Sequence, residues 1–128
     1  MSTVPPKRTR FAGVLVSFGY ACRGLQILFV TQPNARAHLV ATAAVCAAGF
    51  WWRITALEWC ALAGAIGLVS TAEALNTALE FYADLVSPGF HPLAGKAKDV
   101  AAGAVLAASI AAAVIGAIIF VPKIVAAL

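Results

Sequence analysis

Charged residues are scarce in this sequence. They make up 11% of its 128 residues, whereas about a quarter of the residues in a soluble globular domain are charged. Only five residues are acidic, while 62% are hydrophobic. Together with a mean hydropathy of +0.93, this composition excludes an ordinary soluble domain. It indicates a single integral membrane domain over residues 1–128.

Cysteine is also rare, and its pattern excludes two kinds of site. The three cysteines, Cys22, Cys46 and Cys60, are odd in number, lie in apolar stretches and form no C-x-x-C pair. This excludes a disulfide framework and a cysteine-ligated metal centre. We predict that all three are buried as small hydrophobic side chains.

The sequence lacks the marks of several soluble protein classes. Its net charge is +4, but the basic residues are scattered near loops and chain ends, which favours an anionic lipid surface or a phosphate-bearing substrate over nucleic acid. The stretch from Gly89 to Lys96 is one residue too long for a P-loop, and Ala97 replaces the required hydroxyl. Residues 7–22 resemble a signal peptide, but the residues at 19–22 fit cleavage poorly, so we predict none.

The apolar pattern predicts an all-α membrane fold. In residues 7–31 apolar positions recur at three- and four-residue steps, which indicates a helix lying in the membrane interface. Residues 34–52, 56–86 and 97–121 are predicted to be transmembrane helices. The span 34–52 is short, and it crosses only if its start is held at the headgroups.

The boundaries of these helices have recognisable signals. Pro33 ends the first helix, because the residue before a proline is pushed toward extended geometry. Thr55 and Glu58 have the spacing of a capping box. Residues 87–92, rich in proline and glycine, are predicted to be a loop. Residues 1–6 are predicted to be a disordered tail.

One stretch concentrates the acidic residues. Three of the five, Glu73, Glu80 and Asp84, lie in residues 73–84. On a helix these three and Asn76 fall within about 80° of one another. They form one polar stripe on an otherwise apolar helix, and ionisable groups at membrane depth normally mark function.

The basic residues are distributed unevenly around the predicted spans. Only Arg53 and Lys123 lie on one side, and the other seven lie before the first span or between the second and third. By the positive-inside rule, the N-terminus and the acidic stripe face the cytoplasm, where ATP is present.

The residues alone allow three functions. Phosphoryl transfer needs a metal ion, a cation for the developing charge and a group that activates the attacking hydroxyl. Carboxylates of the stripe suit magnesium and general-base roles, and Lys98 offers a point charge to phosphate. The alternatives are an oligomeric proton or cation conductor lined by the stripe, and an accessory assembly subunit that packs through small residues such as Gly103 and Ala107.

The exact residue sequence of the acidic stretch narrows these alternatives. Residues 73–84, EALNTALEFYAD, followed by residues 91–99, HPLAGKAKD, closely resemble the signature of the prokaryotic diacylglycerol kinase family, which includes undecaprenol kinases. The resemblance covers nearly the whole chain. It implies a small homotrimeric kinase of the bacterial cytoplasmic (inner) membrane with one interfacial helix and three spans. It also implies transfer of the γ-phosphoryl of Mg-ATP to a lipid alcohol, diacylglycerol or undecaprenol, at a site that neighbouring chains share.

The resemblance also implies roles for individual residues. Glu73 matches the general base, and Asn76 lies beside it. Glu80 matches a magnesium ligand close to the nucleotide, and Lys98 matches a phosphate-binding lysine. Further positions match the surroundings of the nucleotide: Tyr20, Asp84, His91 and Asp99. Gln32 stands where many members have a metal-binding glutamate, so it is predicted to be a weaker, neutral ligand. Phe90 stands where a tyrosine is frequent.

Overall fold

The computed structural model describes residues 10–128, with side chains from residue 13, and within them it is entirely helical. The helices are α1 (Arg10–Thr31), α2 (Pro33–Trp51), α3 (Ala56–Val86) and α4 (Pro92–Val125). This confirms the predicted all-α fold. The predicted tail, residues 1–6, and the first residues of the predicted helix 7–31 lie outside the described residues.

The helix boundaries follow from local chemistry. Gln32 is extended (φ −107°, ψ 111°) and Pro33 opens α2, because a first-turn proline needs no hydrogen-bonded N–H. At the start of α3 the predicted capping box is present. Thr55 N–H donates to Glu58 Oε2 at 2.7 Å, and Glu58 N–H donates to Thr55 Oγ1 at 3.3 Å.

The predicted start of the last span at residue 97 is wrong, because α4 begins at Pro92. The His91 side chain caps this end: its Nδ1 accepts the Leu93 N–H at 3.2 Å. A proline that looks like a loop residue in the sequence is also a suitable first residue of a helix. Lys98 therefore lies more than one helical turn inside α4, on a rigid element.

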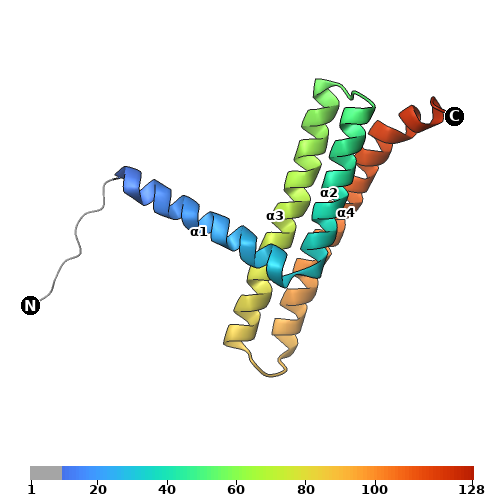
Figure 1. The fold of residues 1–128 in the computed structure, drawn as a ribbon. Coiled ribbons are helices and arrows are strands. Elements are labelled where there is room, and N and C mark those ends of the chain that lie inside the picture. Colours follow the sequence, from blue (N-terminus) through green and yellow to red (C-terminus); the bar gives the residue numbers. More distant parts are fainter. Residues whose placement is uncertain (1–9) are drawn as a thin grey trace, which may run out of the picture.

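The four helices have unequal roles in the arrangement (Figure 1). α2, α3 and α4 lie side by side, whereas α1 projects away from them. α3 and α4 form a long hairpin, and their ends nearest the 87–91 connection extend beyond the level at which α1 joins α2. The acidic stripe lies in this half of α3.

A hydrophobic core cluster lies at the opposite end of the bundle. Its buried residues are Ile54, Leu62, Ile119 and Phe120. Trp52 packs against Phe120 with ring centroids 6.1 Å apart. Near the start of α3, Glu58 forms an ion pair with Lys123 of α4 at 2.8 Å, a contact that the sequence analysis did not predict.

The cysteine prediction is wrong for two positions. Cys22 and Cys60 are exposed, and Cys46 is half-buried. Their helices carry apolar residues on outward faces too, so apolar surroundings in the sequence do not establish burial within the chain. None of the three forms a disulfide within the described residues.

Three helices are long and apolar enough to cross a membrane: α1 over Gly13–Thr31, α3 and α4. The apolar pattern of the sequence predicted spans at α2, α3 and α4 and an interfacial position for α1. By composition α2 falls short, since its first turns carry polar residues such as Arg36 and His38. The chain is a membrane protein, and the interfacial position of α1 remains a prediction.

Candidate active site

The polar stripe of α3 changes steadily in burial along the helix. Glu73 is 3% exposed, Asn76 and Glu80 are half-buried, and Asp84 is exposed. Glu73 lines a cavity of about 150 Å³ with residues of α1 and α2, among them Leu28 and Ala35, both buried. The stripe thus starts beneath the α1–α2 junction and runs to the end of the hairpin where the 87–91 connection joins α3 and α4.

Asn76 and Glu80 are connected within the stripe. The Asn76 Nδ2 donates to Glu80 Oε1 at 3.1 Å. The two residues are four positions apart, so their side chains are neighbours on the helix surface. The Asn76 Oδ1 is buried and has no hydrogen-bond partner among the described residues. An oriented carboxylate with an unpartnered amide oxygen beside it offers two oxygen ligands from one helix.

Lys98 of α4 reaches the stripe from the other side of the hairpin. Its Nζ forms an ion pair with Asp84 Oδ1 at 2.5 Å, with side-chain exposures of 38% and 66%. Asp84, His91 and Lys98 line one pocket of about 220 Å³ with Gly89 of the connection and Gly95 of α4. Cationic, carboxylate and imidazole groups therefore meet at the end of the hairpin that carries the 87–91 connection.

These oxygen donors suit magnesium rather than a closed protein cage. Among the described residues there is no group of three or more His, Cys, Asp or Glu side chains that could hold a metal ion. Magnesium is usually held by one or two carboxylates together with substrate phosphates and water. Glu80 and the free Asn76 Oδ1 fit that kind of site.

Comparisons with known proteins show the family to which this chain belongs. A family model described as prokaryotic diacylglycerol kinase matches residues 19–120. The chain belongs to the prokaryotic diacylglycerol kinase family. This confirms the family and the enzyme class, a lipid kinase, that were predicted from the sequence.

Individual relatives in this family carry two different names. An undecaprenol kinase of Bacillus subtilis is 40% identical over 84% of this chain and 88% of that protein. A diacylglycerol kinase of Synechocystis is 44% identical over 87% of this chain and 64% of that protein. A diacylglycerol kinase of Escherichia coli is 30% identical over 83% of this chain. The family is therefore shown, and the acceptor of this kinase is left open.

Some predicted site residues lie apart from this constellation. Tyr20 is 66% exposed on α1, and Asp99 is exposed on α4. Gln32 is half-buried at the α1–α2 junction, and its side chain makes no capping hydrogen bond there. Within the described part of the kinase these three side chains join no hydrogen bond with the stripe, so their roles remain predictions.

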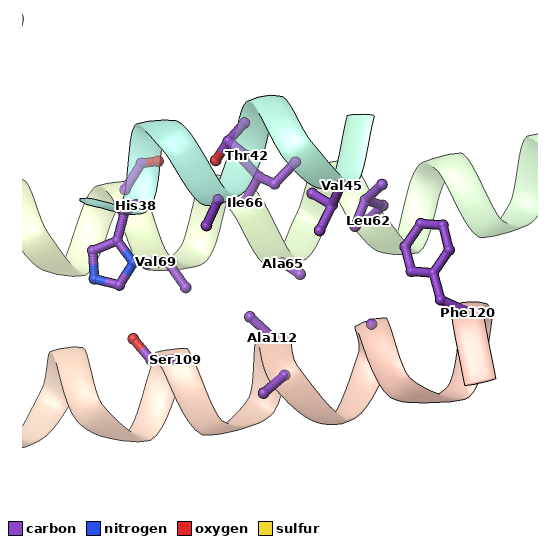
Figure 2. A pocket seen from close by; sticks show the side chains of 14 residues that line it. His38, Thr42, Val45, Leu62, Ala65, Ile66, Val69, Ser109, Ala112 and Phe120 are labelled. Atoms are coloured by element: carbon purple, nitrogen blue, oxygen red, sulfur yellow. The ribbon is translucent and has the colours of Figure 1, made fainter. Parts of the chain in front are cut away.

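A second set of polar residues was not predicted as part of a site. A groove of about 500 Å³ lies between α2, α3 and α4, and Figure 2 shows His38 and Ser109 at one end and Phe120 at the other. His38, Thr42 and Ser70 line both this groove and the cavity that contains Glu73. The spacing of His38 and Thr42, one helical turn apart on α2, was the available sequence signal.

Proposed function

We propose that this chain transfers the γ-phosphoryl group of Mg-ATP to the hydroxyl of a membrane lipid alcohol, either diacylglycerol or undecaprenol. One observation carries the proposal. Glu73 is a carboxylate that is 3% exposed on a helix long and apolar enough to cross a membrane, and it starts a stripe that leads to Lys98. A lipid hydroxyl is able to reach the buried end, and a soluble nucleotide the exposed end.

In the proposed reaction Glu73 is the general base. It accepts the proton of the lipid hydroxyl while the oxygen forms a bond to the γ-phosphorus. The bond between this phosphorus and the β–γ bridging oxygen breaks, and ADP leaves. Asn76, on the same face one turn away, orients Glu80 through its amide hydrogen bond.

The remaining predicted residues bind the nucleotide and its magnesium. When bound, the metal neutralises charge on the phosphate oxygens. Glu80 and the Asn76 Oδ1 are the proposed ligands, with Gln32 as a further neutral one. Lys98 exchanges its partner Asp84 for phosphate oxygens. Other side chains are proposed to surround the nucleotide: Tyr20, Asp84, His91 and Asp99.

We further propose how the kinase sits in its membrane. α2, α3 and α4 cross the bacterial cytoplasmic membrane, and α1 lies in its cytoplasmic interface. The projection of α1 from the bundle (Figure 1), at the level of the cavity that contains Glu73, supports this placement. Three copies assemble into a homotrimer, in line with the unpartnered apolar faces of α3, where Leu68 and Leu75 are exposed.

The decisive experiment is a labelled phosphoryl-transfer assay on reconstituted protein. We expect transfer from γ-labelled Mg-ATP to an added lipid alcohol. Glu73→Gln should lower turnover by at least about 10²-fold, the range of general-base catalysis, while the size of the assembly in detergent is unchanged. Cys60→Ala, at an exposed position near the other end of the same helix, is the control and should retain turnover.

Two results would contradict the proposal. Full turnover in Glu73→Gln would remove Glu73 from the base role. Absence of lipid phosphorylation in the wild type, together with nucleotide-independent proton or cation flux across liposomes, would favour a conductor lined by the acidic stripe.

A further inference from the structure

The groove between α2, α3 and α4 has two unlike ends. Its far end is apolar and is closed by Phe120 and Leu62, both buried. Its other end carries the polar side chains His38 and Ser109, which lie opposite each other on α2 and α4 (Figure 2). We call this second end, formed by His38, Thr42, Ser70 and Ser109, the polar mouth of the groove.

The hydroxyl groups of the polar mouth are unpaired. On α1, Ser17 and Thr31 donate to the carbonyls four residues earlier, at 3.0 and 2.8 Å, which is the usual arrangement for hydroxyls on an apolar helix. Among the described residues, the side-chain hydroxyls of Thr42, Ser70 and Ser109 take part in no hydrogen bond. Their donors are therefore available to a molecule held in the groove.

The mouth is adjacent to the proposed base. His38, Thr42 and Ser70 also line the cavity that contains Glu73. Ser70 lies three residues before Glu73, about 4.5 Å along the helix axis toward the apolar end of the groove. A lipid whose hydroxyl contacts Glu73 would place the next few bonds of its backbone beside these donors.

We infer that the polar mouth selects lipid alcohols that carry ester carbonyls next to the hydroxyl, the diacylglycerol class, over polyprenols. The inference rests on the proposed function and deepens it. Ester carbonyls near the hydroxyl of a diacylglycerol accept hydrogen bonds from the hydroxyl groups of Thr42, Ser70 and Ser109. A polyprenol has no acceptor there, so its binding would bury these hydroxyl groups unpaired, which costs free energy. Sites built to hydrogen-bond one substrate reject analogues that lack the partner.

The test offers a diacylglycerol and a polyprenol in competition to the reconstituted full chain and measures the ratio of their kcat/KM values. The wild type should favour the diacylglycerol. Thr42→Val and Ser109→Ala should each lower this ratio by about 2- to 10-fold, as expected for one lost hydrogen bond, and the double variant should lower it further. Thr71→Val is the control, because Thr71 lines a different pocket between α3 and α4. It should leave the ratio unchanged.

The outcomes separate this inference from the proposed function. If the wild type phosphorylates neither lipid, the proposed function itself is wrong. A wild type that phosphorylates a lipid but favours the polyprenol, or variants whose ratio equals that of the wild type, overturn only the selection by the polar mouth.

A groove-filling variant tests what occupies the space. Ala112 lines the middle of the groove (Figure 2), and Ala112→Phe should lower kcat/KM for both lipids without changing ATP binding or the size of the assembly. If Ala112→Phe instead dissociates the assembly, the groove is an interface between copies of the chain and the inference is wrong.

Discussion

At the scale of single residues, the site depends on the different hydrogen bonding of the two polar side-chain atoms of Asn76. Its Nδ2 holds Glu80 at 3.1 Å, while its Oδ1 is buried without a partner among the described residues. Buried polar atoms without partners are rare and call for an explanation. A bound cation close to Glu80 would satisfy this oxygen.

Replacing Asn76 should therefore weaken magnesium dependence as well as turnover. In Asn76→Leu we expect the magnesium concentration for half-maximal activity to rise by about 10- to 100-fold, the usual effect of removing a group that orients a metal ligand. A magnesium titration of kinase activity measures this. Thr71→Val is the control: Thr71 is exposed on the same helix and lies outside the polar stripe, so its replacement should leave the titration unchanged. Equal magnesium dependence in Asn76→Leu and the wild type would contradict the metal role.

Lys98 should matter for the nucleotide and little for stability. Its ion pair with Asp84 is largely exposed, and exposed pairs contribute at most about 1 kcal/mol. We expect Lys98→Met to change the free energy of unfolding by less than about 1 kcal/mol and to raise the KM for ATP by at least about 10-fold, the cost of one lost charged contact to phosphate.

The conservative variant of Lys98 provides the control. Lys98→Arg keeps the positive charge and should retain most of the affinity for ATP, although its planar group does not reproduce a point charge. An unchanged KM in Lys98→Met would place the phosphate-binding cation elsewhere.

At the scale of helices, α2 and α3 approach each other closely at Gly49. A β-carbon at Gly49 would lie 2.8 Å from the ring of Trp59 and 3.1 Å from Ile54. Phe50 holds the same ring from a second side, with centroids 4.9 Å apart. Glycine is therefore required at position 49 because a β-carbon would prevent the close approach of α2 to α3. Its backbone conformation does not require glycine.

Gly49→Ala should lower the free energy of unfolding in detergent by about 1–3 kcal/mol, the usual cost of overpacking. Gly64→Ala is the matched control on α3, because nothing lies within 4 Å of a β-carbon there. It should be neutral or stabilise the helix by up to about 1 kcal/mol. Reversible unfolding of both variants in a denaturing detergent measures the difference, and equal stabilities would contradict the packing shown.

Helix bounds were predictable to different degrees. The bounds of α3 agree with the predicted 56–86, because the Thr55–Glu58 capping box and the following apolar period both identify its start. The start of α4 was predicted five residues late, at 97 instead of Pro92. His91 and Pro92 resemble loop residues in the sequence, and only the hydrogen bond from Leu93 N–H to the His91 ring shows that they begin a helix.

At the scale of the whole molecule, the proposed topology places the two ends of the bundle in different compartments. Arg53, between α2 and α3, and Gly89, between α3 and α4, lie at opposite ends of the hairpin. In a background without native cysteines, Arg53→Cys should react with a membrane-impermeant maleimide on intact spheroplasts. Gly89→Cys should react only after permeabilisation. The reverse labelling pattern would contradict a cytoplasmic active site.

The local residue pattern was sufficient to predict which residues share a helix face. Periodicity within one helix is a local property, so the stripe of Glu73, Asn76, Glu80 and Asp84, the capping box and the apolar lengths could all be predicted. The motif also identified the family, since its residue types are specific at fixed spacing.

Which helix faces contact each other could be seen only from the packing of the four helices. The pairing of Lys98 with Asp84, the burial of Glu73 beneath α1 and α2, and the unpaired hydroxyl groups around the groove depend on how helices distant in the sequence are aligned. A helical period gives the direction of a side chain relative to its own axis. It carries no information on the register and separation of the neighbouring helix, which the packing of residues such as Gly49 and Trp59 sets.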